Sequence, residues 1–324
     1  MPARSSISSS YQDLAPRALF AGFRVEQLVA RGTVGAVYAA VEPRDGVVVA
    51  LKVLPLAAEY DANDLAETRA RFLQEAKAAA SLRHPDIVTV HGGGESQGRM
   101  FIVMELLSGC DLTRYTRPAR LLPEPVVLHI VVRIAEALAY AHDLGVVHRD
   151  VKPANVMVDL PRQQVKLTDF GIARLDDGMR SRSGVMMGTP SFMAPEQLAG
   201  GRIDGRADLY ALGVLLFQLL TGRLPYEAVS MGQLLMQIAR AAPQELRSLR
   251  PGLPPALSDL VAALLQKDPA ARPGDGRSLA QALRALEVGW PAAVKLAIPL
   301  PEAERGVSAA GGMADPGHNA RHSR

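Results

Sequence analysis

The stretch of sequence that decides the fold is HRDVKPAN, His148 to Asn155, and it is followed by DFG, Asp169 to Gly171, and by APE, Ala194 to Glu196. A single Asp in such a loop usually belongs to a turn or a helix cap, where its side chain bonds to nearby backbone N–H groups. The alternative is that Asp150 and Asp169 gather oxygen atoms around a metal ion or a charged substrate. The rest of the chain decides between these two interpretations.

Two features upstream are compatible with a site for phosphate groups, although each taken alone is more often an ordinary structural feature. Gly32 and Gly35 lie in a hairpin after a predicted strand, where the backbone can approach phosphates closely, although glycines are common in ordinary β-turns. Lys52 lies in VVVALKVL, a strand that is otherwise apolar, so its ammonium needs an anionic partner. Glu75, in the helix that follows, is a candidate partner. The alternative is that Lys52 extends to water at the sheet edge and Glu75 lies on a solvated helix face.

Together these residues resemble the protein kinases, whose H-R-D-x-K-P-x-N, D-F-G and A-P-E motifs occur here in the family's order and at its separations. The resemblance covers about residues 23–286, and the wording of GIARLDD, SFMAPEQ and TGRLPY is similar to the bacterial (Hanks-type) serine/threonine kinases. It implies an α+β, bilobal protein-kinase-like fold, with a small, mostly β N-lobe that has one key helix and a larger, α-rich C-lobe.

The resemblance also implies the catalytic roles. Asp150 is expected to orient the acceptor hydroxyl, and Lys152 to touch the transferred phosphate. Lys52, paired with Glu75, is expected to bind the phosphates of ATP. Tyrosine kinases lack a lysine at the place of Lys152, so the expected acceptor is Ser or Thr.

ATP and Mg²⁺ are the implied cofactors, with Mn²⁺ as a substitute, and Asp169 and Asn155 are the implied metal ligands. Ala30 stands where the family has the first loop glycine, and we expect a stiffer loop because alanine disfavours positive φ. Arg114 stands near the place of a ribose-contacting acidic residue, which leaves the ribose contact unassigned. The implied nucleotide contacts are Gly32, Gly35, Val37, Ala50, Lys52, Met104, Glu105 and Leu107.

The segment between the DFG and APE motifs is expected to be regulatory. Ser181 and Ser183 align with autophosphorylated residues of related kinases, and a phosphate there would pair with Arg149. Thr189 resembles the threonine that positions the substrate. The alternative is an ordinary mobile polar loop. The residues with an implied structural role, which include a buried Glu196–Arg272 ion pair, are His148, Phe170, Gly171, Glu196, Asp208 and Arg272.

Composition supports a folded protein without a nucleic-acid partner, because 324 residues carry 48% hydrophobic residues and a net charge of only +3. Cys110 is the single cysteine, so an internal disulfide is excluded and a cytoplasmic location is expected. The longest uncharged run, 209–222, is shorter than the roughly 20 residues that span a bilayer, which predicts no membrane span.

Periodicity and turn signals divide the chain into segments. Helices are expected at 64–82, 124–144, 208–220, 231–239, 256–266 and 278–286. The expected organisation is a disordered leader at 1–22, the N-lobe at 23–104, the hinge at 105–109, the C-lobe at 110–288 and a flexible tail at 289–324.

The function expected from the resemblance is a serine/threonine protein kinase in signalling, which acts on protein substrates and is regulated by autophosphorylation. One alternative is a pseudokinase or nucleotide-binding scaffold of the same fold, and Ala30 is the feature in its favour. Another is a small-molecule phosphotransferase, which the APE and KPAN segments disfavour. A homodimer through the N-lobe is a further hypothesis.

Overall fold

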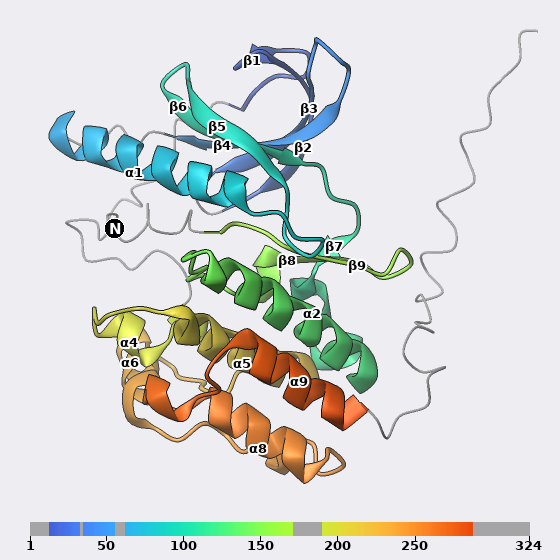
Figure 1. The fold of residues 1–324 in the computed structure, drawn as a ribbon, viewed down its shortest axis with the longest axis vertical. Helices are drawn as coiled ribbons and strands as arrows, with labels where there is room; N and C mark the ends of the chain where they lie inside the picture. The colour runs from blue at the N-terminus through green and yellow to red at the C-terminus, as the bar shows by residue number, and fades with distance from the viewer. Residues whose placement is uncertain (1–12, 33–34, 56–61, 171–189, 288–324) are drawn as a thin grey trace, which may run out of the picture.

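The computed structural model describes residues 13–32, 35–55, 62–170 and 190–287. These residues form two lobes, a small one built around a β-sheet and a larger helical one below it (Figure 1). The bilobal α+β fold expected from the motifs is therefore confirmed.

The small lobe is an antiparallel sheet, and its described strands follow the order β1-β2-β3-β4-β6-β5. Helix α1 (Ala62–Ser81) packs against β5. Alternation of side chains gives the sheet two buried faces. The strands are β1 (Leu19–Phe20), β2 (Phe23–Arg31), β3 (Ala36–Val41), β4 (Val48–Pro55), β5 (Val90–Ser96) and β6 (Arg99–Glu105).

Each face of this sheet belongs to a different hydrophobic core. The outer face contributes Tyr38, Leu51 and Val53 to a core that lies within the small lobe. The inner face contributes Ile102, which joins the main core of the large lobe. The sheet therefore separates a local core from one that spans both lobes.

The prediction of a disordered leader over residues 1–22 is wrong for residues 13–22. Strand β1 pairs with β2, and the Phe20 side chain is fully buried in the small-lobe core, edge to face with Phe101. Asp13 contacts Arg31 and accepts a hydrogen bond of 3.2 Å from the Tyr38 hydroxyl. The sequence pattern missed this segment because its apolar run is too short to show a period. Residues 1–12 lie outside the described part.

The large lobe is built on two apolar helices, α2 (Glu124–Asp143) and α5 (Gly205–Thr221), which pack against each other. Helix α9 lies along α2, and α8 packs on α5 (Figure 1). A small sheet of β7 (Cys110–Asp111), β8 (Val156–Asp159) and β9 (Gln164–Leu167) lies above α2. The remaining helices are α4 (Pro195–Leu198), α6 (Met231–Arg240), α7 (Leu246–Leu249), α8 (Pro255–Leu264) and α9 (Gly276–Glu287).

Backbone and side-chain bonds join the lobes along an interlobe seam made of residues 86–89, Glu105 and residues 166–167. Val88 N–H donates to the Leu167 carbonyl (3.0 Å), and Leu167 N–H donates to the Asp86 carbonyl (2.8 Å). Glu105 N–H donates to the Thr89 carbonyl (2.9 Å). The chain segment after α1 is therefore fixed to β9 of the large lobe.

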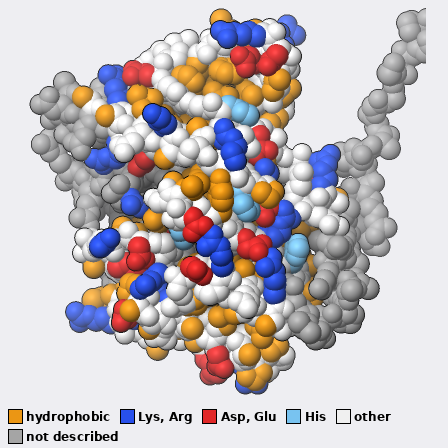
Figure 2. All heavy atoms as spheres, in the orientation of Figure 1, with side chains coloured by type: hydrophobic (Ala, Val, Ile, Leu, Met, Phe, Trp, Pro, Cys, Tyr) orange, Lys and Arg blue, Asp and Glu red, His pale blue; other side chains and the backbone are white. Residues whose placement is uncertain are grey.

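Among the described helices, α2 alone is long and apolar enough to cross a membrane by length and composition, and 67% of its apolar window is buried inside the protein. This is the burial expected of the core helix of a folded lobe. On the face of the described part shown in Figure 2, basic and acidic side chains are interspersed.

Candidate active site

Asp208 anchors the loop that contains the HRD motif. It lies in the first turn of α5 and is completely buried. Its carboxylate accepts hydrogen bonds from His148 N–H (2.8 Å) and Arg149 N–H (2.6 Å), and its Oδ2 lies 2.7 Å from His142 Nε2. A buried carboxylate needs such partners, so Asp208 fixes the backbone just before Asp150.

The contacts of His148 fit the structural role that the resemblance implies. Its Nδ1 accepts a hydrogen bond of 3.2 Å from Asp150 N–H, which leaves the proton on Nε2. Nε2 can then donate to the Thr168 carbonyl at 2.8 Å, and the ring packs on Phe170 with centroids 4.5 Å apart. The imidazole thus ties the HRD loop to the DFG segment and has no nitrogen left for a substrate proton.

Two motif residues of the HRD loop converge on the carboxylate of a third, Asp150. Lys152 Nζ lies 2.7 Å from Asp150 Oδ2, and Asn155 Nδ2 donates to the same oxygen at 2.8 Å. Asn155 also donates to the backbone carbonyl of Asp150 at 2.8 Å. The Asp150 carboxyl is 29% exposed, so it is held in place while one side stays accessible to a substrate.

Lys52 and Asp169 bring the two lobes together at the site. Lys52 Nζ lies 2.7 Å from Asp169 Oδ1, with 17% and 26% of the two side chains exposed. Burial by itself raises the pKa of Asp169, but the Lys52 ammonium outweighs it and holds the pKa below its usual range. Asp169 is therefore ionised and has a second oxygen for a cation.

Glu75 lies on α1 and is partly buried. The expected Lys52–Glu75 pair stays a prediction, because the carboxylate that the structure places on Lys52 is that of Asp169.

The donor set fits Mg²⁺, the metal that the resemblance implies. Asp169 offers a carboxylate oxygen, and Asn155 uses its amide nitrogen for both bonds to Asp150, which leaves the amide oxygen for a cation. Carboxylate and amide oxygens are ligands that Mg²⁺ prefers, usually with substrate phosphates and water completing the shell.

Strand register places four of the predicted nucleotide contacts, Val37, Ala50, Lys52 and Met104, on one face of the small-lobe sheet. Val37 pairs with Lys52, and Ala50 pairs with Met104. Because residues two apart on a strand share a face, Lys52 and Ala50 point the same way, toward the large lobe. This face is opposite to the local core of Tyr38, Leu51 and Val53.

The glycine hairpin is tight, and one of its two glycines is required sterically. Gly32 N–H donates to the Gly35 carbonyl at 2.8 Å. A Cβ on Gly35 would lie 2.3 Å from the Val53 carbonyl oxygen, whereas one on Gly32 would lie 3.6 Å from its nearest neighbour. Ala30 is within β2 and has no positive φ, so alanine causes no backbone strain there.

Glu105 uses its side chain to brace the hinge. Its Oε1 accepts hydrogen bonds from Thr89 N–H and from Lys166 Nζ, each 2.7 Å long. Burial by itself raises the pKa of Glu105, but the bonds from Lys166 and Thr89 outweigh it and lower the pKa. A hollow of about 620 Å³ beside this brace is lined by Pro85, residues 105–108, Arg133, Arg162 and residues 164–166.

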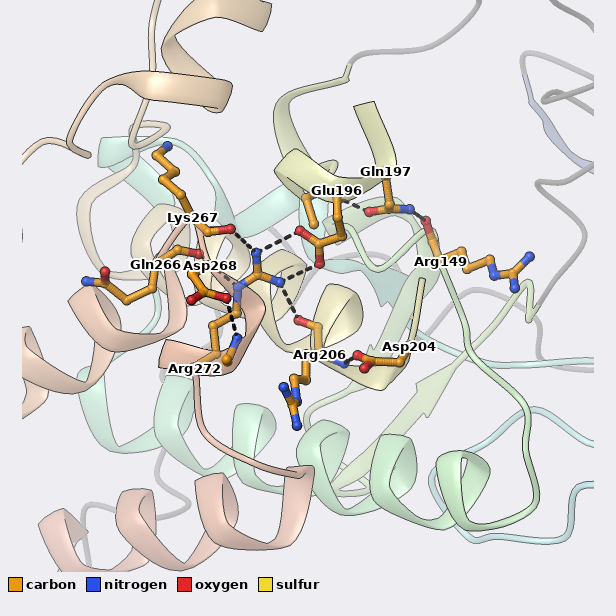
Figure 3. A network of polar contacts seen from close by, with 11 residues as sticks. Arg149, Glu196, Gln197, Asp204, Arg206, Gln266, Lys267, Asp268 and Arg272 are labelled. Atoms are coloured by element: carbon orange, nitrogen blue, oxygen red, sulfur yellow. Dashed lines mark hydrogen bonds and ion pairs between the residues drawn. The ribbon is translucent and has the colours of Figure 1, made fainter. Parts of the chain in front are cut away.

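The APE segment is fixed by the expected ion pair (Figure 3). Arg272 Nη1 and Nη2 bind the two oxygens of Glu196 at 2.6 and 2.8 Å, and the Arg272 side chain is fully buried. Arg272 also donates to the carbonyls of Gln266 (2.8 Å), Arg206 (3.0 Å) and Lys267 (3.2 Å). The ion pair is bidentate, and the remaining N–H donors of Arg272 are hydrogen-bonded. This arrangement offsets the free-energy cost of removing the two charges from water.

Four predicted residues, Gly171, Ser181, Ser183 and Thr189, lie outside the described residues. The sequence interpretation missed two polar residues that support the site, Lys166 at the hinge and Gln197 beside the APE motif. Gln197 had a weak signal, since a Gln three residues after a helix N-cap often bonds back to it. Lys166 had none, because nothing local connects it to Glu105.

These features define a two-lobed protein with lysine–carboxylate contacts, and with carboxylate and amide oxygens that suit a metal ion, where the lobes meet. The protein kinase domain model matches residues 23–286, and the chain belongs to the protein kinase family.

Serine/threonine-protein kinase pkn3 of Myxococcus xanthus is 40% identical over 277 residues, which cover 82% of this chain and 50% of pkn3. Serine/threonine-protein kinase PknF of Mycobacterium tuberculosis is 41% identical over 263 residues, 79% of this chain and 54% of PknF. The crystal structure of the M. tuberculosis PknI kinase domain matches with a TM-score of 0.68 and 35% identity, and covers 84% of this chain and 99% of that one. The chain spans about half the length of these curated relatives.

Proposed function

We propose that this protein is a serine/threonine protein kinase that transfers the γ-phosphoryl group of Mg²⁺–ATP to Ser or Thr hydroxyls of proteins. The observation that carries the proposal is a set of three contacts at the site: Lys152 and Asn155 each contact Asp150, and Lys52 contacts Asp169. Phosphoryl transfer needs positioning and charge neutralisation more than covalent catalysis, and this set of groups supplies both.

Each residue has a part in this mechanism. Asp150 accepts the hydrogen bond of the substrate hydroxyl and directs its oxygen in line with the γ-phosphorus. As the new O–P bond forms and the bond to the β-phosphate oxygen breaks, the hydroxyl proton passes to Asp150. Lys52 and Lys152 offset the negative charge on the phosphates. Asp169 and Asn155 would hold Mg²⁺, which would supply further positive charge beside the phosphates.

The relatives support the choice of acceptor, since pkn3 and PknF bear the name serine/threonine-protein kinase. The proposal includes regulation by autophosphorylation at Ser181 or Ser183, with Thr189 in substrate positioning. It also retains the predicted cytoplasmic location and homodimer through the N-lobe.

The test is Mg²⁺- and ATP-dependent phosphate incorporation by the purified chain into itself and into matched Ser, Thr and Tyr peptides, with mass-spectrometric site mapping. Asp150→Asn keeps the size of the side chain and removes the carboxylate, so incorporation should fall by about 10² or more. Incorporation restricted to Ser and Thr supports the proposal. ATP binding without incorporation in the wild type would favour the pseudokinase, and phosphorylation of small molecules alone would favour the small-molecule enzyme.

A further inference from the structure

The amide of Gln197 bridges the APE segment and the HRD loop. Gln197 lies on α4, next to Glu196, and its Nε2 donates to the Arg149 carbonyl at 3.0 Å (Figure 3). Its Oε1 accepts a hydrogen bond of 2.9 Å from Ala194 N–H. Both ends of the amide are used, and only this orientation pairs each donor with an acceptor.

The Arg149 carbonyl is not an arbitrary acceptor, because it belongs to the same planar peptide group as Asp150 N–H. That N–H donates to His148 Nδ1 at 3.2 Å. The peptide plane is therefore held at its oxygen by Gln197 and at its N–H by His148. The orientation of this peptide plane therefore sets the direction of the Asp150 backbone from its N–H onward.

This peptide plane needs external support, since Arg149 has φ of 68°, in the left-handed region that residues other than Gly disfavour. Asp208 holds the Arg149 N–H from α5 at 2.6 Å, and Gln197 holds its carbonyl from α4. Helix α4 is in turn fixed by the bond between Glu196 and the buried Arg272. The chain of contacts thus runs from Arg272 through α4 to the backbone of the catalytic loop.

We propose that Gln197 is a positioning residue for Asp150. Through its bond to the Arg149 carbonyl, Gln197 links the anchored APE segment to the catalytic loop. The inference rests on the proposed kinase function for its catalytic consequence. Its structural part, the fixed Arg149–Asp150 peptide, does not depend on that function.

The first variant, Gln197→Met, keeps the length of the side chain and removes both bonds. We expect kcat to fall about tenfold, the effect of losing the one bond that reaches the catalytic loop, from Gln197 to the Arg149 carbonyl. The KM for ATP should be unchanged, because the predicted nucleotide face lies on other elements. Gln281→Met, at an exposed position of α9, is the matched control and should leave kcat within about twofold.

The second variant, Gln197→Glu, separates positioning from general stability. An ionised Glu can only accept hydrogen bonds, whereas a protonated one can again donate to the Arg149 carbonyl and accept from Ala194 N–H. The ratio of its kcat to that of the wild type should therefore rise as the pH is lowered from 7 to about 4.5, where an ordinary Glu carboxyl takes up its proton, while the ratio for Gln197→Met stays flat. A flat ratio for Gln197→Glu, or wild-type turnover in Gln197→Met, overturns the inference.

Hydrogen exchange of residues 148–152 keeps the two proposals distinguishable. If the two variants have equal melting temperatures, the backbone amides of these residues should exchange faster in Gln197→Met than in Gln281→Met. Absence of turnover in the wild type would count against the kinase function and leave the exchange result to decide the role of Gln197. Unchanged exchange in Gln197→Met would reject the fixed peptide whether or not the wild type turns over.

Discussion

Lys52 and Asp169 are 117 residues apart in the chain, yet their side chains meet at 2.7 Å. One comes from β4 of the small lobe and the other from the segment after β9 of the large lobe. The ammonium lowers the pKa of a carboxyl group that burial alone would raise. The charges that a metal–nucleotide complex requires are thus brought together by the contact of the two lobes.

Replacement of Lys52 by Met should lower kcat by about 10² to 10³, the cost of removing one group that stabilises developing charge. It should also raise the pKa of Asp169, because the strongest of the interactions that offset its burial is then removed. Mn²⁺ binding in the presence of ADP, followed by electron paramagnetic resonance, should consequently be lost at a higher pH than in the wild type. Lys77→Met, at an exposed position of α1, is the control. Equal pH profiles for Lys52→Met and the wild type would contradict this prediction.

Removal of Arg272 should be the costliest change outside the reacting groups. Arg272→Met leaves Glu196 with a partly buried, unpaired carboxylate, and we expect the free energy of unfolding to fall by about 3 to 5 kcal/mol in urea titrations. Arg24→Met breaks a 2.8 Å pair with Glu26 whose side chains are 57% and 40% exposed, and should cost at most about 1 kcal/mol. Similar losses of unfolding free energy in the two variants would show that the buried Glu196–Arg272 pair contributes no more to stability than an exposed ion pair.

The two hairpin glycines should respond differently to alanine. Gly35→Ala places a methyl group against the Val53 carbonyl, so β3 must move away from β4 and the melting temperature should fall by several degrees. Gly32→Ala meets only an ordinary contact at 3.6 Å and should melt within about 2 °C of the wild type. Differential scanning calorimetry of both variants checks the prediction, and a larger loss for Gly32→Ala would refute it.

The Glu105–Lys166 brace predicts how stability depends on pH. Because the folded-state pKa of Glu105 is lowered, its contribution is present above the ordinary value of 4.5 and is lost as the pH falls through the folded pKa. The free energy of unfolding of the wild type should therefore fall more steeply below pH 4.5 than that of Lys166→Met. Parallel curves for the two proteins would mean that the bond contributes nothing measurable.

The neighbours Leu19 and Phe20 test whether the segment before β2 belongs to the fold. Phe20 is fully buried, and Phe20→Ala should cost about 3 to 5 kcal/mol. Leu19 is 64% exposed, and Leu19→Ala should change stability by about 0.5 kcal/mol or less. Chemical denaturation of both variants decides the matter, and a harmless Phe20→Ala would show that the segment is dispensable.

The sequence predicted long periodic elements well. The helix expected at 124–144 is Glu124–Asp143, and that expected at 278–286 is Gly276–Glu287. Strand β5 cannot be recognised from its sequence, VHGGGES, because three consecutive glycines interrupt any alternating pattern and lower its β propensity. Its glycines have a tertiary reason, since a Cβ on Gly93 would lie 2.8 Å from the Phe101 carbonyl oxygen.

At the site, the motif residues could be predicted but not all of their partners. Asp150, Lys152 and Asn155 lie within six consecutive residues, so local structure brings them together. Two contacts depend on how distant segments pack. They are the contact of Lys52 with Asp169 and the bond from Gln197 to the Arg149 carbonyl. No pattern within either segment encodes that packing.

The interlobe seam limits how the two lobes can move. Residues 86–88 are bonded to β9, and Thr89 is bonded to Glu105, so the lobes share a strip of backbone that cannot separate without breaking these bonds. Any relative motion of the lobes that keeps these bonds intact is then limited to a rotation about this strip, with the smallest displacements beside Leu167.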